Sequence, residues 1–78
     1  MNYDLAMMAL EGLRRAPLSV EVTRDRVRIE GDAAGFRELA RLCLLLGGES
    51  GQEGDGFELE PPTHLTKGSS ALHLRSAR

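Results

Sequence analysis

The chain has 78 residues, with 10 Lys and Arg against 12 Asp and Glu and a formal net charge of −2. Apolar residues make up 41% of the sequence and charged residues 28%, which is ordinary globular composition and argues against disorder of the whole chain. The charge balance provides no basic excess to attract nucleic acid. We therefore expect one small domain, residues 1–78, with a thin core and little room for elaborate chemistry.

The sequence contains a single cysteine, Cys43, which cannot form a disulfide within the chain. Because it lies in a Leu-rich run, we expect it to be a small buried residue in a protein of the reducing cytoplasm. The apolar stretch Leu5–Leu10 follows no basic region and is too short for a signal peptide or a membrane span. These features predict a cytoplasmic protein that does not enter the membrane.

The first predicted element is an N-terminal helix over about residues 3–15, which Pro17 helps to end. The segment is rich in helix-forming residues, and Asn2 or Asp4 can cap its first turn. Gly12 weakens the helix by roughly 1 kcal/mol relative to alanine. Two overlapping apolar stripes follow the helical spacing: Ala6, Leu10 and Leu13, and Tyr3, Met7 and Leu10.

Residues 18–30 alternate between apolar and polar side chains, which is typical of a half-buried β-hairpin. A turn centred on Arg24 and Asp25 places apolar residues opposite one another and opposite charges together. The predicted pairs are Val22 with Val27, Val20 with Ile29, and Glu21 with Arg28. Since Arg-Asp is a poor dipeptide for a type I′ turn, we expect a four-residue loop with the same pairing rather than a two-residue loop.

A second helix is predicted to begin after Asp32, a good N-cap, and to end at Gly47, where a C′ glycine belongs. Its predicted buried face consists of Phe36, Leu39, Ala40, Leu42, Cys43 and Leu46. Residues 47–56 hold five glycines and three acids, which predicts a flexible acidic loop.

Phe57–Glu60 and Ala71–Arg75 have the alternation of short strands, and Pro61 stops the first of them. The predicted fold class is α+β, in the order helix, hairpin, helix, hairpin. We expect the two hairpins to form one four-stranded antiparallel sheet with both helices on one face.

Several patterns that suggest chemistry have simpler interpretations. The glycine-rich loop follows a helix and carries acids, unlike a phosphate-binding loop. Ser69 and Ser70 are interpreted as turn residues rather than as nucleophiles paired with a histidine. The spacing of His64, His73 and Cys43 matches no zinc pattern, and Glu53 and Asp55 lack the alternating ligands of a calcium loop. We therefore predict no catalytic, cofactor-binding or metal-binding residues.

The outer face of the predicted sheet is the candidate functional surface. Strand parity places charged side chains of both signs on it: Glu21, Arg26, Arg28, Glu58, Glu60, His73 and Arg75. A mixed face without interleaved aromatic residues favours a protein partner over nucleic acid. The candidate partner-binding residues are Glu21, Arg26, Arg28, Glu58, His73 and Arg75, and charge reversal at Arg26 and Arg28 is expected to weaken capture of the partner.

Residues 27–75 resemble a known family. The strand-to-helix junction Ile29–Ala40, the Leu-rich helix after it and the segment Leu65–Leu74 look like the thirty-second family of bacterial polymorphic-toxin immunity proteins. The resemblance implies a small cytoplasmic bacterial protein that binds a toxin domain without catalysis.

Three functions thus follow from the sequence. The leading one is a non-catalytic protein-binding module without a cofactor, which the resemblance implies acts like an immunity protein. The alternative is a self-associating domain, a homodimer formed through Met7, Met8 and Leu10 or through an unpaired sheet edge. The third is a domain that binds a small ligand or acts as an enzyme.

Overall fold

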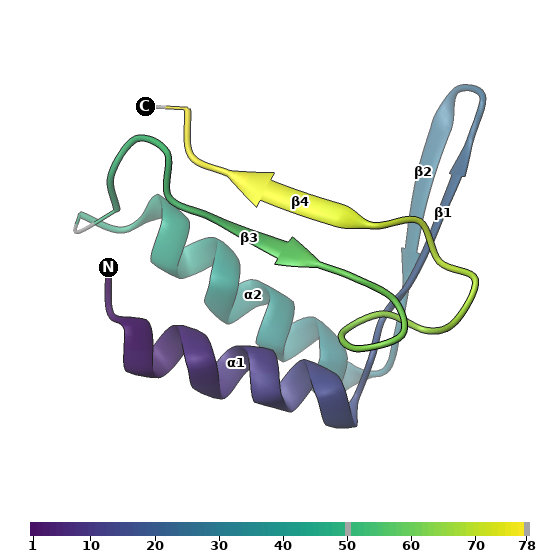
Figure 1. The fold of residues 1–78 in the computed structure, drawn as a ribbon, viewed down its shortest axis with the longest axis horizontal. Coiled ribbons are helices and arrows are strands. Elements are labelled where there is room, and N and C mark those ends of the chain that lie inside the picture. The colour runs from purple at the N-terminus through teal and green to yellow at the C-terminus, as the bar shows by residue number, and fades with distance from the viewer. Residues whose placement is uncertain (50, 78) are drawn as a thin grey trace.

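The computed structural model describes residues 1–49 and 51–77. The elements follow the predicted order: α1 (Tyr3–Arg15), β1 (Ser19–Thr23), β2 (Arg26–Glu30), α2 (Ala33–Gly47), β3 (Gly56–Leu59) and β4 (Leu72–Arg75). The two helices lie side by side, the β3–β4 hairpin covers them on one side, and the β1–β2 hairpin projects from one end (Figure 1). The α+β class is therefore confirmed.

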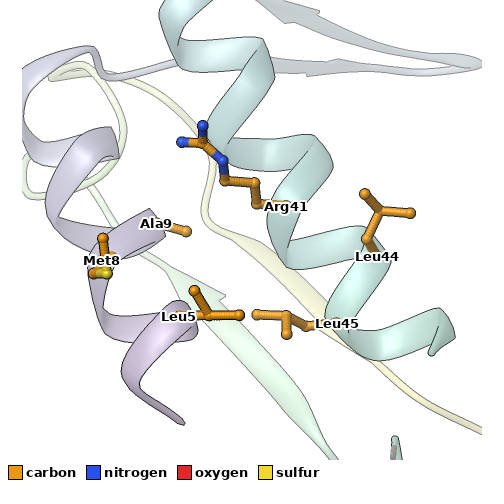
Figure 2. A pocket seen from close by; sticks show the side chains of 6 residues that line it. All are labelled: Leu5, Met8, Ala9, Arg41, Leu44 and Leu45. Atoms are coloured by element: carbon orange, nitrogen blue, oxygen red, sulfur yellow. The ribbon is translucent and has the colours of Figure 1, made fainter. Parts of the chain in front are cut away.

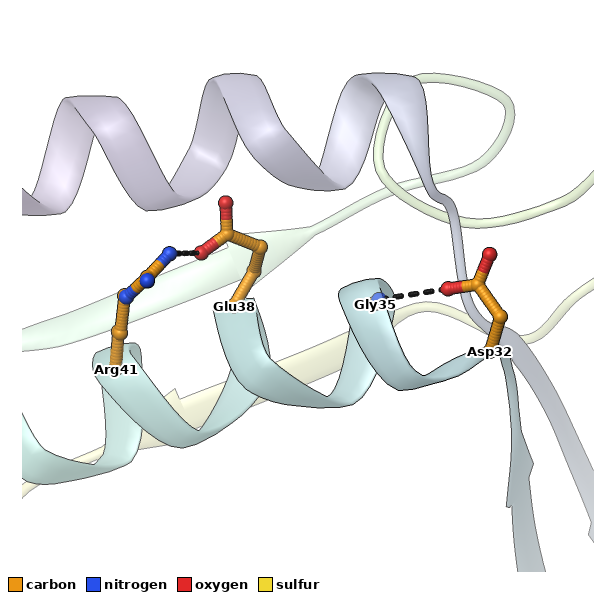
Figure 3. Close-up of polar contacts among 4 residues, drawn as sticks. All are labelled: Asp32, Gly35, Glu38 and Arg41. Atoms are coloured by element: carbon orange, nitrogen blue, oxygen red, sulfur yellow. Dashed lines mark hydrogen bonds and ion pairs between the residues drawn. The ribbon is translucent and has the colours of Figure 1, made fainter.

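Both helices begin at the predicted caps. The Asn2 side chain accepts a hydrogen bond from the Leu5 amide at 3.1 Å, so Asn2 rather than Asp4 caps α1. Asp32 accepts one from the Gly35 amide at 2.8 Å and caps α2 (Figure 3). At its far end, α2 includes Gly47 and is capped by Gly48, two residues later than a C′ glycine at position 47 predicts.

The helices approach closely where α1 has no side chain. A Cβ atom at Gly12 would lie 1.7 Å from Oε2 of Glu38, so the Glu38 carboxylate occupies the space that this glycine leaves. Glu38 also pairs with Arg41 one turn further along α2 (Figure 3). Gly12 therefore costs helix propensity but permits a tight contact between helices.

The β1–β2 register is the predicted one, with Val20 opposite Ile29 and Glu21 opposite Arg28. The predicted four-residue loop is wrong, because Thr23 pairs with Arg26 and leaves a two-residue turn. Among the described residues, no residue other than glycine has a positive φ. The turn therefore avoids the type I′ geometry for which Arg-Asp is poorly suited.

The single four-stranded sheet is also wrong, since the hairpins form two separate two-stranded sheets. The irregular connection between β3 and β4 occupies the outer edge of β1. The Thr66 amide donates to Leu18 O at 2.8 Å, the Leu18 amide to His64 O at 3.3 Å, and the Ser70 amide to Val20 O at 2.9 Å. The β1 edge, one of the two edges to which β3 or β4 could pair, is thus already hydrogen-bonded.

The core lies between the helix pair and the β3–β4 hairpin. It consists of Ala6, Ala9, Leu13, Leu18, Val20, Leu42, Phe57, Leu59 and Leu65. Val22 and Val27, predicted to face inward, are 57% and 60% exposed because the β1–β2 hairpin extends beyond the helices (Figure 1).

Most of the predicted buried face of α2 is also wrong. Only Leu42 of that set is buried; Leu39 and Leu46 are half-buried, whereas Phe36, Ala40 and Cys43 are exposed. A two-stranded hairpin covers a narrower strip of helix than a four-stranded sheet would, so one apolar row suffices on this side.

The flexibility of residues 47–56 stays a prediction. Described residues of this loop carry backbone hydrogen bonds: the Gly51 amide donates to Gly48 O at 3.1 Å, and the Asp55 amide donates to Gln52 O at 3.0 Å. The loop also contacts the C-terminal segment, because the Ser76 amide donates to Asp55 O at 2.7 Å.

Candidate functional site: an apolar groove between the helices

The predicted charged face is divided between the two hairpins. On β1–β2, Glu21 lies opposite Arg28 and Thr23 lies opposite Arg26, so these side chains share one face. All of them are exposed. They belong to a sheet that makes no strand pairing with β3–β4, so the prediction of one continuous charged face is wrong.

The remaining charged residues lie on the outer face of β3–β4. Glu58 pairs with His73, and Arg75 pairs with Gly56. His73 Nε2 lies 2.9 Å from Oε1 of Glu60, which follows the strand. The role of either surface in binding a partner stays a prediction.

The surface formed by α1 and α2, unlike the charged hairpin faces, contains an apolar groove. A groove of about 460 Å³ runs between α1 and α2. Figure 2 shows Leu5 of α1 and Leu45 of α2 pointing toward one another across the space between the helices, with β3 and β4 behind them. We call it the helix groove; its residues are Leu5, Met8, Ala9, Arg41, Leu44 and Leu45.

The groove exists because α1 carries apolar residues on more than its core-facing side. Ala6 and Ala9 are buried, whereas Leu5 is 50% and Met8 67% exposed. On α2, Leu44 is 73% exposed while Leu42 is fully buried. Small Ala9 at the floor keeps the groove open, and the large side chains form its walls.

Beside the helix groove lies a rim that carries charged side chains of both signs. A second hollow adjoins the groove, sharing Met8 and Arg41, and is lined further by Met7, Glu11, Arg15 and Glu38. The apolar patch is thus bordered by two carboxylates and two guanidinium groups. An apolar centre with a charged edge is a pattern that many protein interfaces share.

Sequence reasoning found only half of this surface. Met7 and Met8 were named for the self-associating alternative, but Leu10 is half-buried and does not line the groove. Leu44 and Leu45 were not singled out. The consecutive run Leu44–Leu46 was the available signal, because adjacent residues point in directions about 100° apart and cannot all face one core.

The Ser69 hydroxyl has a structural role that agrees in part with its interpretation as a turn residue. Its Oγ lies 3.0 Å from Thr66 Oγ1 within the turn, and it also accepts a hydrogen bond from the Val20 amide at 3.1 Å. Ser69 therefore helps to hold the connecting segment against β1.

His64 has an unusual environment in that segment. Its Nδ1 is buried and has no hydrogen-bond partner among the described residues. The pKa of His64 is lowered from its ordinary value of 6.5, first by burial and then by the positive charge of Arg14; Glu11 and Glu60 act in the opposite direction. The fold therefore favours the neutral imidazole.

This shift predicts a pH-dependent stability. As pH falls below 6.5, the unfolded chain binds a proton at His64 before the folded chain does, so stability is lost down to the lowered pKa. His64→Gln should make the free energy of unfolding fall less between about pH 7.5 and about pH 5.5. Urea denaturation of both chains at several pH values measures this difference, and parallel pH profiles would contradict it.

Comparison of the chain with protein-family models, with curated proteins and with solved structures finds no match. The resemblance to immunity proteins and the expected cytoplasmic location stay predictions. In the described part of the chain, neither helix combines the length and hydropathy that crossing a bilayer requires.

Proposed function

We propose that this chain is a small non-catalytic protein-binding module that self-associates through the helix groove and its rim. The observation that supports this function is the exposure of Leu5, Met8 and Leu44 around one hollow. Exposed contiguous apolar surface costs free energy in water and marks interaction sites in soluble proteins.

A second copy of the chain is the occupant that fits the rim. Glu11, Glu38, Arg15 and Arg41 line the hollow beside the apolar centre, so the rim carries both signs in equal number. Such a surface can complement itself about a two-fold axis, with the exposed Glu11 of one copy opposite a guanidinium group of the other, while Glu38 stays paired with Arg41 of its own chain. A strongly acidic or basic partner would find no matching field here.

A dimer interface would need only a small part of the surface of this chain. A standard interface removes about 800 Å² from each partner, which is about 15% of the 5330 Å² surface of this chain. Tyr3 and Met7, one helical turn apart on α1 and both more than half exposed, extend the apolar surface beside the groove. The helix face thus offers enough large side chains for a small dimer interface.

The proposal predicts that Met8→Lys with Leu44→Lys abolishes the dimer. Both side chains lie at the groove and are largely exposed, so the monomer should fold unchanged. A buried, unpaired ammonium costs several kcal/mol, so dimer affinity should fall roughly a hundredfold or more. Sedimentation equilibrium at rising concentration measures this, with circular dichroism to confirm the fold.

The matched control is Arg26→Glu with Arg28→Glu on the β1–β2 hairpin, which should leave dimerisation unchanged. Loss of the dimer in this control would move the contact to that hairpin and contradict the groove assignment. A wild-type chain that stays monomeric at high micromolar concentration would overturn self-association; a different protein, such as the toxin domain that the resemblance implies, would then be the remaining partner.

A further inference from the structure

The outer face of the β3–β4 hairpin gathers three side chains of metal-binding type: Glu58, Glu60 and His73. One ligand atom from each lies within 4.8 Å of the other two. The closest pair is His73 Nε2 and Glu60 Oε1, at 2.9 Å. All three residues are exposed, so an ion can reach them and the carboxylates can turn toward it.

Strand geometry explains why these groups meet. Glu58 and Glu60 are two positions apart and point to the same side of the chain. The antiparallel register places His73 directly opposite Glu58. The intervening Leu59 and the preceding Phe57 are buried in the core, which fixes the hairpin beneath the cluster. Glu58 and His73 therefore lie on a packed element, and Glu60 directly follows it.

We propose that Glu58, Glu60 and His73 bind a divalent transition-metal ion of the Zn²⁺ type. One imidazole nitrogen and two carboxylate oxygens are donors that Zn²⁺ accepts, and three protein ligands leave the fourth tetrahedral position to water. In such a site, bonds of about 2.1 Å place the ligand atoms roughly 3.4 Å apart. Small rotations of exposed side chains bring the cluster to this spacing.

The donor set also selects the class of ion. Imidazole favours transition metals over Mg²⁺ and Ca²⁺, which prefer oxygen ligands in larger number. The two carboxylates balance the charge of a divalent cation. Arg75 shares this face of β4, opposite Gly56, and its positive charge sets the affinity below that of a purely anionic site.

This proposal replaces the expectation of no metal-binding residues, which rested on spacing along the chain. Ligands on two paired strands have no characteristic sequence spacing, so only the register reveals them. The cluster lies on the outer face of the hairpin, whereas the helix groove opens on the other side of the helix pair. Metal binding and self-association can therefore be tested separately.

The test is calorimetric titration of the untagged chain with ZnCl₂, together with Co²⁺ absorption as a report of coordination geometry. We expect one equivalent of Zn²⁺ to bind and Co²⁺ to give a tetrahedral visible spectrum. His73→Ala and Glu60→Gln should each weaken binding by roughly tenfold or more. Zn²⁺ should also raise the Tm of the wild-type chain but not of these variants.

Two controls distinguish this site from other donors. His64→Gln removes the other histidine and Cys43→Ser removes the exposed thiol, and both variants should bind Zn²⁺ as the wild type does. Absence of binding by the wild type would overturn the proposal. So would unchanged binding by His73→Ala, or a Co²⁺ spectrum with thiolate bands that disappears in Cys43→Ser.

Discussion

Leu65→Ala should destabilise the protein by about 2 to 5 kcal/mol, the range for a buried leucine replaced by alanine. Leu65 is fully buried although it belongs to the irregular connection between β3 and β4, and it forms a bridge with Leu18. Removing its side chain leaves a cavity where the two hairpins and the helices meet. The free energy of unfolding of small proteins is about 0.05–0.15 kcal/mol per residue. A loss of this size is therefore a large part of the total stability of the chain.

Urea denaturation followed by circular dichroism measures this effect. The matched control is Leu44→Ala, which removes the same atoms from a side chain that is 73% exposed. At a concentration too low for dimers, the control should change stability by less than about 0.5 kcal/mol. Equal destabilisation by the two variants would show that Leu65 does not anchor the connection.

Alanine substitution at two glycines of α2 should have effects of opposite sign. At Gly35 an added Cβ would lie 2.7 Å from the backbone oxygen of Ala16 and 3.0 Å from Leu18 Cδ2. Backbone must then move where α1 leads into β1, which should cost about 1 to 3 kcal/mol. At Gly47 an added Cβ meets nothing within 4 Å, so the helix gains a few tenths to about 1 kcal/mol.

The same denaturation experiment tests this pair. Both substitutions replace glycine by alanine within one helix. The gain in helix propensity is therefore common to both variants and cancels when their free energies of unfolding are compared. If Gly35→Ala were as stable as Gly47→Ala, the close approach between α2 and the end of α1 would be wrong.

Local signals predicted the elements well. The cap at Asp32, the alternation of residues 18–30 and the apolar-to-apolar pairing of Val20 with Ile29 each depend on near neighbours in the chain. These interactions are strong enough to determine helices, hairpins and register without knowledge of the rest of the fold.

Assembly of those elements was less predictable. The β1 edge is hydrogen-bonded by Thr66 and Ser70, which lie in a segment whose sequence has no periodic pattern. Once that segment occupies the edge, the hairpins separate, and Val22 and Val27 lose the cover that a four-stranded sheet would provide. Cys43 is exposed for a related reason, because the narrow β3–β4 hairpin covers little of α2.

The candidate sites show the same division. Met7 and Met8 could be found from one helix alone, whereas Leu44 joins them only after α1 and α2 pack together. The Glu58, Glu60 and His73 cluster likewise needs the β3–β4 register. Residues that share a site through tertiary packing leave no fixed spacing in the sequence.

The most direct test of self-association through the helix groove uses Cys43, the single cysteine of the chain, which is exposed on α2 and does not itself line the groove. A chain spin-labelled at Cys43 is mixed with a ¹⁵N-labelled Cys43→Ser chain, and paramagnetic broadening is measured by NMR. The groove interface predicts the strongest intermolecular broadening around Leu5, Met8 and Leu44. Broadening strongest in the β1–β2 hairpin, or none at high concentration, would contradict it.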